Sequence, residues 1–583
     1  MRRRIALVGG LLFLVAIAFG CWLAYEGSKA KSNLEAARSS AQQAKDELLK
    51  GNSEEASQRV GEARAHAQTA HDATHSLPWN IASGVPWLGS PLKTGQQITD
   101  VVRGLTADVL QPSADVAAAL SPDRLLEGGR VDVQLLRESE SRLAEISKAG
   151  ERLNADAASI SEPAYLSTMK DARIQLQAQT SDVSSLIEKT ALAARLVPAM
   201  MGVDGPRTYF MGFQTNAEAR GTGGLLGGFG ILRFDDGRPA VNTLGPNTEF
   251  NIPFRPFSLG PEFDAQWGFT NPTTDFRNSN MSPHFPHAAR IWKSMWKQQS
   301  GADVDGVIAV DPVALSYVLG AVGPVTMTDG ETITKDNVVE LTESTVYSRF
   351  PTDQTARKQY LQDVANEVVR KLTGPVDSPR QLLDALGRAV SEGRIAVWSS
   401  LPADQQLLEQ TPLAHVVPDD SAPYAAVVVN NLGGNKLDYY LRREIEYSAD
   451  GCEGEARNST VTIRMTNTAP EGPLPEYVAG SEGLRQQLPV DVPSGTSVSS
   501  VSLLATTNAK IVGAIVDGRR TPVFTNAERG HPAFEVQVAI PRGQTSEIKF
   551  LLKEPTSPGA PRVPVQPLVD NVIPVVSVPE CPS

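Results

Sequence analysis

The 583-residue chain has few cysteines, few aromatic residues and no surplus of positive charge. It contains three cysteines, 6% aromatic residues and a formal net charge of −12. Three cysteines are too few for a disulfide framework. The acidic balance argues against a nucleic-acid binder, because such proteins neutralise phosphates with an excess of lysine and arginine. Hydrophobic residues at 41% with 21% charged residues exclude both a polytopic membrane protein and a disordered chain.

Several enzyme signatures are also missing. The chain has no G-x-x-x-x-G-K-[ST] phosphate loop, no H-E-x-x-H zinc pair and no G-x-S-x-G nucleophile elbow. The glycine-rich run from Gly221 to Gly230 does not match G-x-G-x-x-G in any register. Glycines at this density allow close backbone approach, either to a neighbouring strand or to an anion held by main-chain N–H groups. We favour packing as the role of this run.

The one long apolar run lies at the N-terminus. Three arginines at positions 2–4 precede the uncharged segment 5–25, which as a helix covers about 30 Å of hydrocarbon. Residues 1–26 are therefore predicted to form a cytoplasmic tip and one transmembrane anchor, with the rest of the chain on the outer side of the cytoplasmic membrane. A cleaved signal peptide and lipidation at Cys21 are the alternatives, although no A-x-A site closes the run.

The remaining chain divides into four segments, so that the predicted fold class is α+β and multidomain. Residues 27–197 show helical periodicity and predict an antiparallel helical bundle, or stalk. In residues 198–439 strands alternate with helices, which indicates an αβα sandwich around a central mixed sheet and includes a predicted strand at 424–430. Residues 440–553 have the short, turn-bounded runs of an antiparallel β-sandwich, and residues 554–583 form a proline-rich tail.

Segment 77–91 interrupts the predicted bundle. It contains Trp79 and Trp87 together with several prolines and glycines. Either a turn between helices or a position at the lipid interface fits this composition. We favour the turn.

Cys452 and Cys581 are the only cysteines in the predicted exported part, where disulfides persist. A bond between them would tie the tail back to the last domain and, in the chain-entropy model, stabilise the fold by about 4–5 kcal/mol. Two free thiols are the alternative.

Two histidine pairs have spacings that metal ligands use, His71 with His75 and His284 with His287. Neither pair has an obvious third ligand in the sequence, so structural or exposed histidines are the favoured interpretation. Asp305 and Asp311 flank an apolar strand and are expected to be turn or helix-capping residues rather than ligands.

Basic residues in four loops of the predicted α/β domain are the more informative feature. They are Arg220, Arg277, Arg349, and the adjacent pair Arg357 and Lys358. The planar fork of a guanidinium group donates two hydrogen bonds to a phosphate at once. Gathered at one rim, these residues would bind a phosphate or pyrophosphate. Scattered surface positions are the alternative.

Motifs in the same loops resemble those of the DUF4012 family of bacterial envelope proteins. The resemblance covers about residues 200–450 and lies in NAEARGTGG at 216–224, RNSN at 277–280 with SPHFP at 282–286, VDGVIAVDP at 304–312 with Gly323-Pro324, and NLGGNK at 431–436. Asn278 stands where the family pattern usually has aspartate.

This pattern is in turn distantly similar to that of the LytR-CpsA-Psr phosphotransferases. Tyr347-Ser-Arg349 matches a Y-x-R element of those enzymes, and the stretch 353–359 resembles their arginine-rich helix start. The resemblance implies an αβα sheet with an apolar, lipid-accepting groove and arginines on a lipid pyrophosphate. It also implies a Mg²⁺ ion held by acidic side chains, for which Glu218, Asp275 and Asp353 are the candidates.

Two functions follow from these expectations. The first is a membrane-anchored envelope protein that binds a lipid-linked, pyrophosphate-bearing saccharide without catalysis, or that scaffolds envelope polysaccharide assembly. The second is a phosphotransferase that moves a glycan from polyprenyl pyrophosphate to the cell wall with Mg²⁺. The sequence assigns no catalytic residue. Expected partners are the cytoplasmic membrane, a polyprenyl-linked saccharide and a cell-wall polymer, with no nucleic acid.

Overall fold

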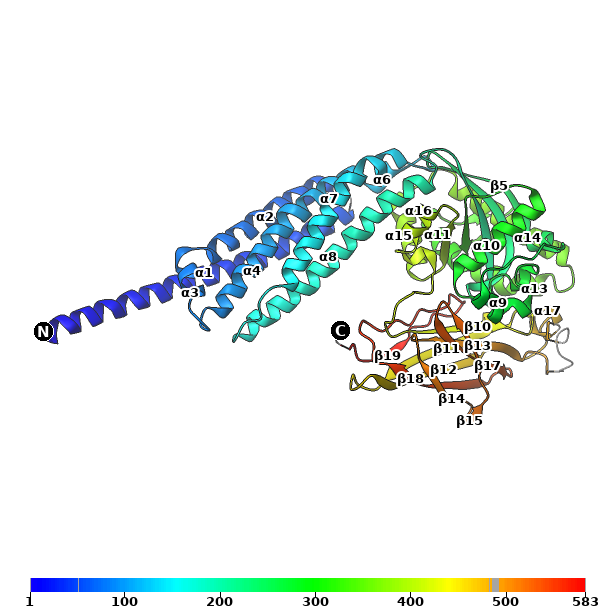
Figure 1. The fold of residues 1–583 in the computed structure, drawn as a ribbon. Coiled ribbons are helices and arrows are strands. Elements are labelled where there is room, and N and C mark those ends of the chain that lie inside the picture. The colour runs from blue at the N-terminus through cyan, green and yellow to red at the C-terminus, as the bar shows by residue number, and fades with distance from the viewer. Residues whose placement is uncertain (1, 51, 482, 485–491, 582–583) are drawn as a thin grey trace. The chain divides into compact units, whose positions relative to one another are not determined.

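The computed structural model describes residues 2–50, 52–481, 483–484 and 492–581, without the side chains of residues 2–17 and 49–50. The chain forms two compact units (Figure 1). The first extends to Leu126 and resumes at Asp132–Ala199; the second contains Glu127–Val131 and everything from Met200 onward.

The first unit is an antiparallel helical bundle, with its helices side by side in Figure 1. The helices are α1 (Arg2–Lys50), α2 (Ser53–Thr74), α3 (Leu77–Ser83), α4 (Ser90–Gly104), the π-helical turn η1 (Leu105–Leu110), α5 (Gln111–Ala119), α6 (Pro122–Leu125), α7 (Val133–Ala158) and α8 (Ser167–Met200). Ala56, Ala63, Ala67 and Ala70 are buried along one face of α2. Their small side chains allow α1 and α2 to pack closely.

Among the residues that the structure describes, no helix is both long and apolar enough to span a membrane. Most side chains of the predicted anchor, segment 5–25, lie outside the described part. The predicted interruption of the bundle contains α3 and the turn after it. Trp79 is buried there and donates its indole N–H to the Leu92 carbonyl at 2.9 Å, whereas Trp87 is 67% exposed.

The second unit begins with a five-stranded mixed sheet in the order β5-β4-β3-β6-β9. The strands are β3 (Arg207–Arg220), β4 (Gly223–Asp235), β5 (Arg238–Pro246), β6 (Gly306–Val310) and β9 (Ile395–Ser399). Only β3 and β6 run parallel. Helix α10 (Phe285–Ser300) packs on one face, and α11 (Pro312–Val322), α14 (Gln354–Leu372) and α15 (Pro379–Ser391) cover the other. The predicted αβα sandwich is thereby confirmed.

Period-two alternation along β3 divides its side chains between the two faces. Phe210 points to the α10 face, where it packs with Phe285 and Trp292 in a fully buried core. Met211 and Phe213 point to the opposite face, under α11 and α14, and remain partly exposed. One face of the sheet is therefore densely packed and the other is not.

Short elements complete this part of the chain. They are β1 (Leu126–Glu127), β2 (Arg130–Val131), η2 (Asn247–Phe250), α9 (Pro261–Trp267), η3 (Gly268–Thr270), η4 (Phe276–Asn278), β7 (Val325–Thr326), β8 (Thr332–Ile333), α12 (Val338–Glu340), the π-helical η5 (Leu341–Thr345), α13 (Val346–Arg349), α16 (Pro402–Leu408), η6 (Pro412–Ala414), η7 (Leu437–Tyr440) and α17 (Glu476–Ala479).

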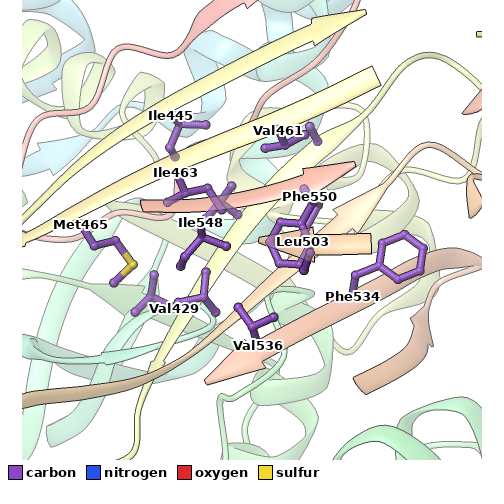
Figure 2. Packing of buried hydrophobic residues seen from close by; sticks show 14 of the residues in the cluster. Val429, Ile445, Val461, Ile463, Met465, Leu503, Phe534, Val536, Ile548 and Phe550 are labelled. Carbon is purple, nitrogen blue, oxygen red and sulfur yellow. The ribbon is translucent and has the colours of Figure 1, made fainter. Parts of the chain in front are cut away.

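The C-terminal part is the predicted β-sandwich. One sheet has the order β10-β13-β17-β16, and the other β15-β14-β18-β12-β11-β19. Their bounds are β10 (Ala425–Asn431), β11 (Leu441–Ala449), β12 (Ala456–Asn467), β13 (Ser497–Ala505), β14 (Lys510–Val516), β15 (Arg519–Thr521), β16 (Phe524–Glu528), β17 (His531–Ile540), β18 (Thr545–Pro555) and β19 (Val575–Ser577). Figure 2 shows Val429, Ile463 and Leu503 within the apolar core that these strands bury.

Two features differ from the expected domain limits. The predicted strand 424–430 exists as β10, but it pairs with β13 in the sandwich rather than with the five-stranded sheet. The tail returns across the second unit, because β19 pairs in parallel with β11 and Cys452 is bonded to Cys581. The predicted disulfide is confirmed.

The glycine-rich run packs against backbone, in agreement with the favoured interpretation. A Cβ at Gly221 would lie 2.1 Å from the Met281 carbonyl oxygen, and one at Gly224 would lie 2.2 Å from that of Thr215. Asp311 caps α11 by accepting the Ala314 N–H at 2.8 Å. Asp305 instead links strands, because its carboxylate accepts the Thr208 N–H at 2.7 Å.

Candidate functional site

An apolar cavity of about 320 Å³ lies between the sheet and helices α11 and α14. This volume is at the lower end of the range of small-molecule sites. The apolar lining includes Met211, Phe213, Leu225, Leu244, Ile308, Val310, Leu315, Val318, Leu361, Val364, Val368 and Leu372. These side chains come from both layers, so the cavity follows the interface between sheet and helices.

The sequence of β4 explains why this interface is not filled. Gly227 and Gly228 line the cavity and offer no side chains to it, whereas a Cβ at Gly245 of β5 would lie 2.6 Å from the Phe229 ring. Across from them, Ala365 on α14 contributes only a methyl group. A face built from such small residues leaves space that the facing helices do not occupy. The glycine-rich run thus allows close packing at Gly221 and Gly224 and supplies open space a few residues later.

One end of the cavity is polar. Arg357 and Lys358 reach it from the first turn of α14, which Asp353 caps by accepting the Ala356 N–H at 2.9 Å. Lys436 reaches it from the residue before η7. The same end is lined by Glu343, Tyr347 and Tyr477.

Arg357 and Lys358 have no carboxylate partner among the described residues. The Arg357 guanidinium lies 4.0 Å from the ring centroid of Tyr477 and donates to the Phe350 carbonyl at 3.2 Å. Lys358 donates to the Asn247 side-chain oxygen and to the Gly227 carbonyl. Burial, together with the charges of Lys436 and Arg357, lowers the pKa of Lys358 to about 7. The lowered pKa reflects the unfavourable free energy of a charged lysine in this buried position. A bound anion would offset that free energy and raise the pKa again.

Lys436 belongs to a buried ion-pair triad. The Glu218 carboxylate accepts from the Arg220 guanidinium at 2.9 Å and also pairs with Lys436. Burial would raise the pKa of Glu218, but the two cations outweigh it and hold that pKa below its usual value. Two positive groups around one carboxylate leave the triad with an excess of one positive charge. Lys436 Nζ also lies 5.1 Å from the Tyr477 centroid, on the ring that Arg357 approaches.

Glu343 is buried at the same end, in the π-helical turn η5. It accepts the Thr215 hydroxyl at 2.8 Å and the Ala217 N–H at 2.6 Å, where β3 bulges away from β4. Burial raises the pKa of Glu343 to about 7 against these hydrogen bonds. π-helical turns often occur at functional sites because they change the direction of a side chain.

Only part of the predicted anion set lines this cavity. Arg357 and Lys358 do. Arg220 is buried beside the site, in the triad. Arg277 instead forms a two-pronged pair with Asp275 at 2.8 and 2.9 Å, and Arg349 forms one with Glu331 at 2.8 and 2.7 Å; neither lines the cavity.

The three carboxylates expected to hold Mg²⁺ are not brought together. Glu218 lies in the triad, Asp275 pairs with Arg277, and Asp353 is the cap of α14. In the described part of the chain, the one group of three side chains with metal-ligand geometry is His71, His75 and Asp100 in the bundle. The structure therefore gives no support for a Mg²⁺ site formed by these carboxylates.

Sequence reasoning missed three residues of the polar end. Lys436 ends the NLGGNK motif, so its position in that motif was an available signal. Glu343 stands in a helical stretch with no distinguishing pattern, and Tyr477 is about 120 residues from Arg357. Contacts over such separations are decided by tertiary packing.

Comparison with known proteins agrees with part of this description. Residues 204–347 match the family model DUF4012, described as a protein of unknown function, which confirms the resemblance over that segment. No curated protein matches the chain. A solved structure from Legionella pneumophila, provisionally described as a nutrient binding protein, is 7% identical with a TM-score of 0.15, over 24% of this chain. The match spans 45% of that protein, and a similarity this low carries no argument.

Proposed function

We propose that this protein binds a lipid-linked saccharide through its phosphate or pyrophosphate group, without catalysis, at the outer face of the cytoplasmic membrane. The observation that carries the proposal is an apolar cavity with two cations at one end that lack a carboxylate partner among the described residues. An amphiphile with an anionic head complements both properties.

The tail would supply most of the binding free energy. Each methylene group transferred from water into an apolar site contributes about 0.8 kcal/mol. The head would supply selectivity, because charge-assisted hydrogen bonds from Arg357 and Lys358 require an anion. Lys436 and the Tyr477 ring lie at the same end and fit a phosphate followed by a sugar.

Binding without turnover is favoured over transfer because the acidic groups of this region are already engaged. Glu218 is held by two cations, and Asp438 accepts from Asn431 and the Ala219 N–H, both at 2.7 Å. One observation supports the phosphotransferase alternative. Glu343 lies at the polar end with a pKa of about 7, a value that suits a general acid or base.

Exposed apolar side chains in the bundle support the proposed location at a membrane. Trp22 and Tyr25 on α1 are 48% and 65% exposed, and Trp87 and Leu88 in the turn after α3 are 67% and 55% exposed. Tryptophan and tyrosine are enriched at membrane–water interfaces. A Cβ built at Gly27 on α1 would lie 3.6 Å from the Trp79 ring, so the α3 segment lies next to the residues that follow the predicted anchor.

The test is a binding titration of the full chain in nanodiscs. A polyprenyl pyrophosphate-linked saccharide, the same tail with a hydroxyl end, and a neutral glycolipid serve as ligands. We expect binding of the first at least about tenfold tighter than of the other two, with no polyprenyl monophosphate formed when Mg²⁺ and a cell-wall acceptor are added. Equal affinity for all three would refute the anionic head. Formation of polyprenyl monophosphate, with the glycosyl phosphate transferred to the acceptor, that is lost in Glu343→Gln would favour the phosphotransferase.

A further inference from the structure

We infer that the helical bundle contains a zinc site formed by His71 of α2, His75 at the C-cap of α2 and Asp100 of α4. The two histidines are four residues apart, one in the last turn of the helix and one directly after it, and their rings are stacked on each other. Asp100 approaches them from the neighbouring helix. This third ligand is separated from the pair by α3 and a turn, which explains why it is not apparent in the sequence.

The distances fit one small cation. Asp100 Oδ1 lies 3.1 Å from His71 Nε2 and 3.6 Å from His75 Nε2. All three donor atoms lie within 4.8 Å of one another. Zinc bonds of about 2.0–2.1 Å in a tetrahedron place donor atoms roughly 3.3–3.4 Å apart. The two separations from Asp100 lie on either side of that value.

The other ring nitrogens face hydrogen-bond acceptors. His75 Nδ1 lies 3.0 Å from the His71 carbonyl oxygen, and His71 Nδ1 lies 3.5 Å from Asp72 Oδ1. Protons on the Nδ1 atoms leave the Nε2 lone pairs free to bind a metal, which is how most zinc-binding histidines are oriented. The rings are stacked 4.0 Å apart, and both Nε2 atoms lie near Asp100 Oδ1.

The donor set indicates the metal. Two imidazoles and one carboxylate suit zinc better than magnesium or calcium, which prefer oxygen ligands. The rings are nearly parallel, with 15° between their planes, so metal binding requires them to turn about χ2 until both lone pairs point at one centre, and this torsion is soft in histidine. His71, His75 and Asp100 are partly exposed, with side chains 19%, 33% and 49% accessible, so an ion reaches them from solvent and a water completes the tetrahedron.

The experiment uses the full chain, purified without a histidine tag. After treatment with EDTA and gel filtration, Zn²⁺ is titrated against a competing chromophoric chelator. We expect one equivalent per chain, a thermal midpoint that rises with zinc concentration, and a tetrahedral d–d absorption spectrum when Co²⁺ replaces zinc. Absence of all three in the wild-type chain would overturn the site.

Variants locate the ion. Asp100→Asn keeps the shape of the side chain and removes its charge, and we expect at least about tenfold weaker zinc binding with little change in the metal-free thermal midpoint. His71→Asn is expected to behave in the same way. His66→Gln is the matched control, because His66 lies on the same helix and contacts Asn33 at 2.9 Å, outside the cluster. Equal zinc affinity in all three variants would assign the ion elsewhere and refute the site.

Discussion

At the scale of single residues, the charge state of two adjacent side chains decides what the cavity accepts. Arg357 supplies a guanidinium group. Lys358 is only partly charged at neutral pH, because burial beside other cations lowers its pKa to about 7. An anionic ligand would restore its proton, so ligand binding and proton uptake are coupled at this lysine.

We therefore expect affinity for the pyrophosphate lipid to fall as pH rises above about 7. The free protein loses the Lys358 proton in this range, and the loss amounts to at most tenfold per pH unit up to the pKa in the complex. Titrations between pH 7 and 9.5 measure it. Lys358→Met should bind more weakly at pH 7 and show a shallower profile, because Glu343 still titrates near pH 7 at the same end of the cavity. Equal slopes in the wild type and in Lys358→Met would count against a head group at Lys358.

The same lysine gives the stability of the free protein the opposite pH dependence: affinity falls as pH rises, whereas stability increases. Its folded pKa lies below its unfolded value near 10.5, so the unfolded chain binds more protons between about pH 7 and 10.5. The contribution of Lys358 to stability therefore rises with pH across this window. The difference in thermal midpoint between wild type and Lys358→Met, recorded without ligand, should shift in favour of the wild type over that range.

Arg357 and Arg349 form a matched pair for testing the head group. Arg357 lines the cavity, whereas Arg349 is paired with Glu331 and does not. We expect Arg357→Gln to weaken binding by about 10- to 100-fold, the effect of one charge-assisted hydrogen bond. Arg349→Gln should change affinity less than twofold. The reverse order in the same titration would assign the anion to Arg349.

At the scale of elements, strand β4 performs two tasks with one glycine-rich run. Gly224 allows the strand to pass against the carbonyl of Thr215, at the bulge that carries Glu218. Gly227 and Gly228 leave the face below α14 without side chains. Because the same element aligns the bulge and opens the cavity, its glycines are expected to differ in how they respond to substitution.

Gly224→Ala should destabilise the second unit by about 2–3 kcal/mol. Its Cβ would lie 2.2 Å from a backbone oxygen, which only a backbone shift relieves. Gly268→Ala is the control, since the nearest atom to its Cβ lies 4.0 Å away. Urea unfolding followed by tryptophan fluorescence compares the two, and equal midpoints would contradict the close contact at Gly224.

Helix α14 offers a test of the cavity itself. Ala365→Leu adds apolar volume to unoccupied space, so the thermal midpoint should hold or rise while lipid affinity falls at least about tenfold. Asn366→Leu places the same side chain on the exposed side of α14 and should leave affinity unchanged. Unaltered binding in Ala365→Leu would show that the tail lies elsewhere.

At the scale of the whole molecule, the C-terminal tail joins the two halves of the second unit. Gln566 donates to the carbonyl of Arg220, at the end of β3, at 2.6 Å, and the Pro567 carbonyl accepts from Asn216, in the β3 bulge, at 2.8 Å. Asp570 pairs with Arg443 of the sandwich at 2.7 Å. The segment that ends in the disulfide therefore also holds the backbone around the Glu218 triad.

Removing the disulfide should destabilise this arrangement. The bond joins cysteines 129 residues apart, and in the chain-entropy model its loss costs about 4–5 kcal/mol. Cys452→Ser/Cys581→Ser is expected to lower the thermal midpoint by several degrees and to weaken lipid binding through the β3 bulge. Cys21→Ser, at a free cysteine, is the control. A midpoint equal to that of the control would indicate that the noncovalent contacts of the tail are enough to stabilise the second unit without the disulfide.

The sequence by itself determined the helical bundle, the αβα and β-sandwich layers, the disulfide and the role of Gly221 and Gly224. The layers follow from periodicity and turn residues, which act over a few residues. The disulfide follows from the presence of only two cysteines in the predicted exported part, and the packing role of the glycines from their density. Arg357 and Lys358 were candidates as basic residues at a helix start, but nothing in the sequence separated them from Arg277 and Arg349. The membrane anchor and the bound lipid remain predictions.

Only the tertiary structure decided which charges remain available for a ligand. Arg277 and Arg349 looked equivalent to Arg357 in sequence, yet Arg277 is neutralised by Asp275, two residues away, and Arg349 by Glu331, which tertiary packing brings to it. Asp100 lies close to the histidines, and Lys436 to Tyr477, because the fold brings separate segments of the chain together. The physical reason is that Coulomb interactions depend on distance in space and on burial, neither of which is encoded by spacing along the chain.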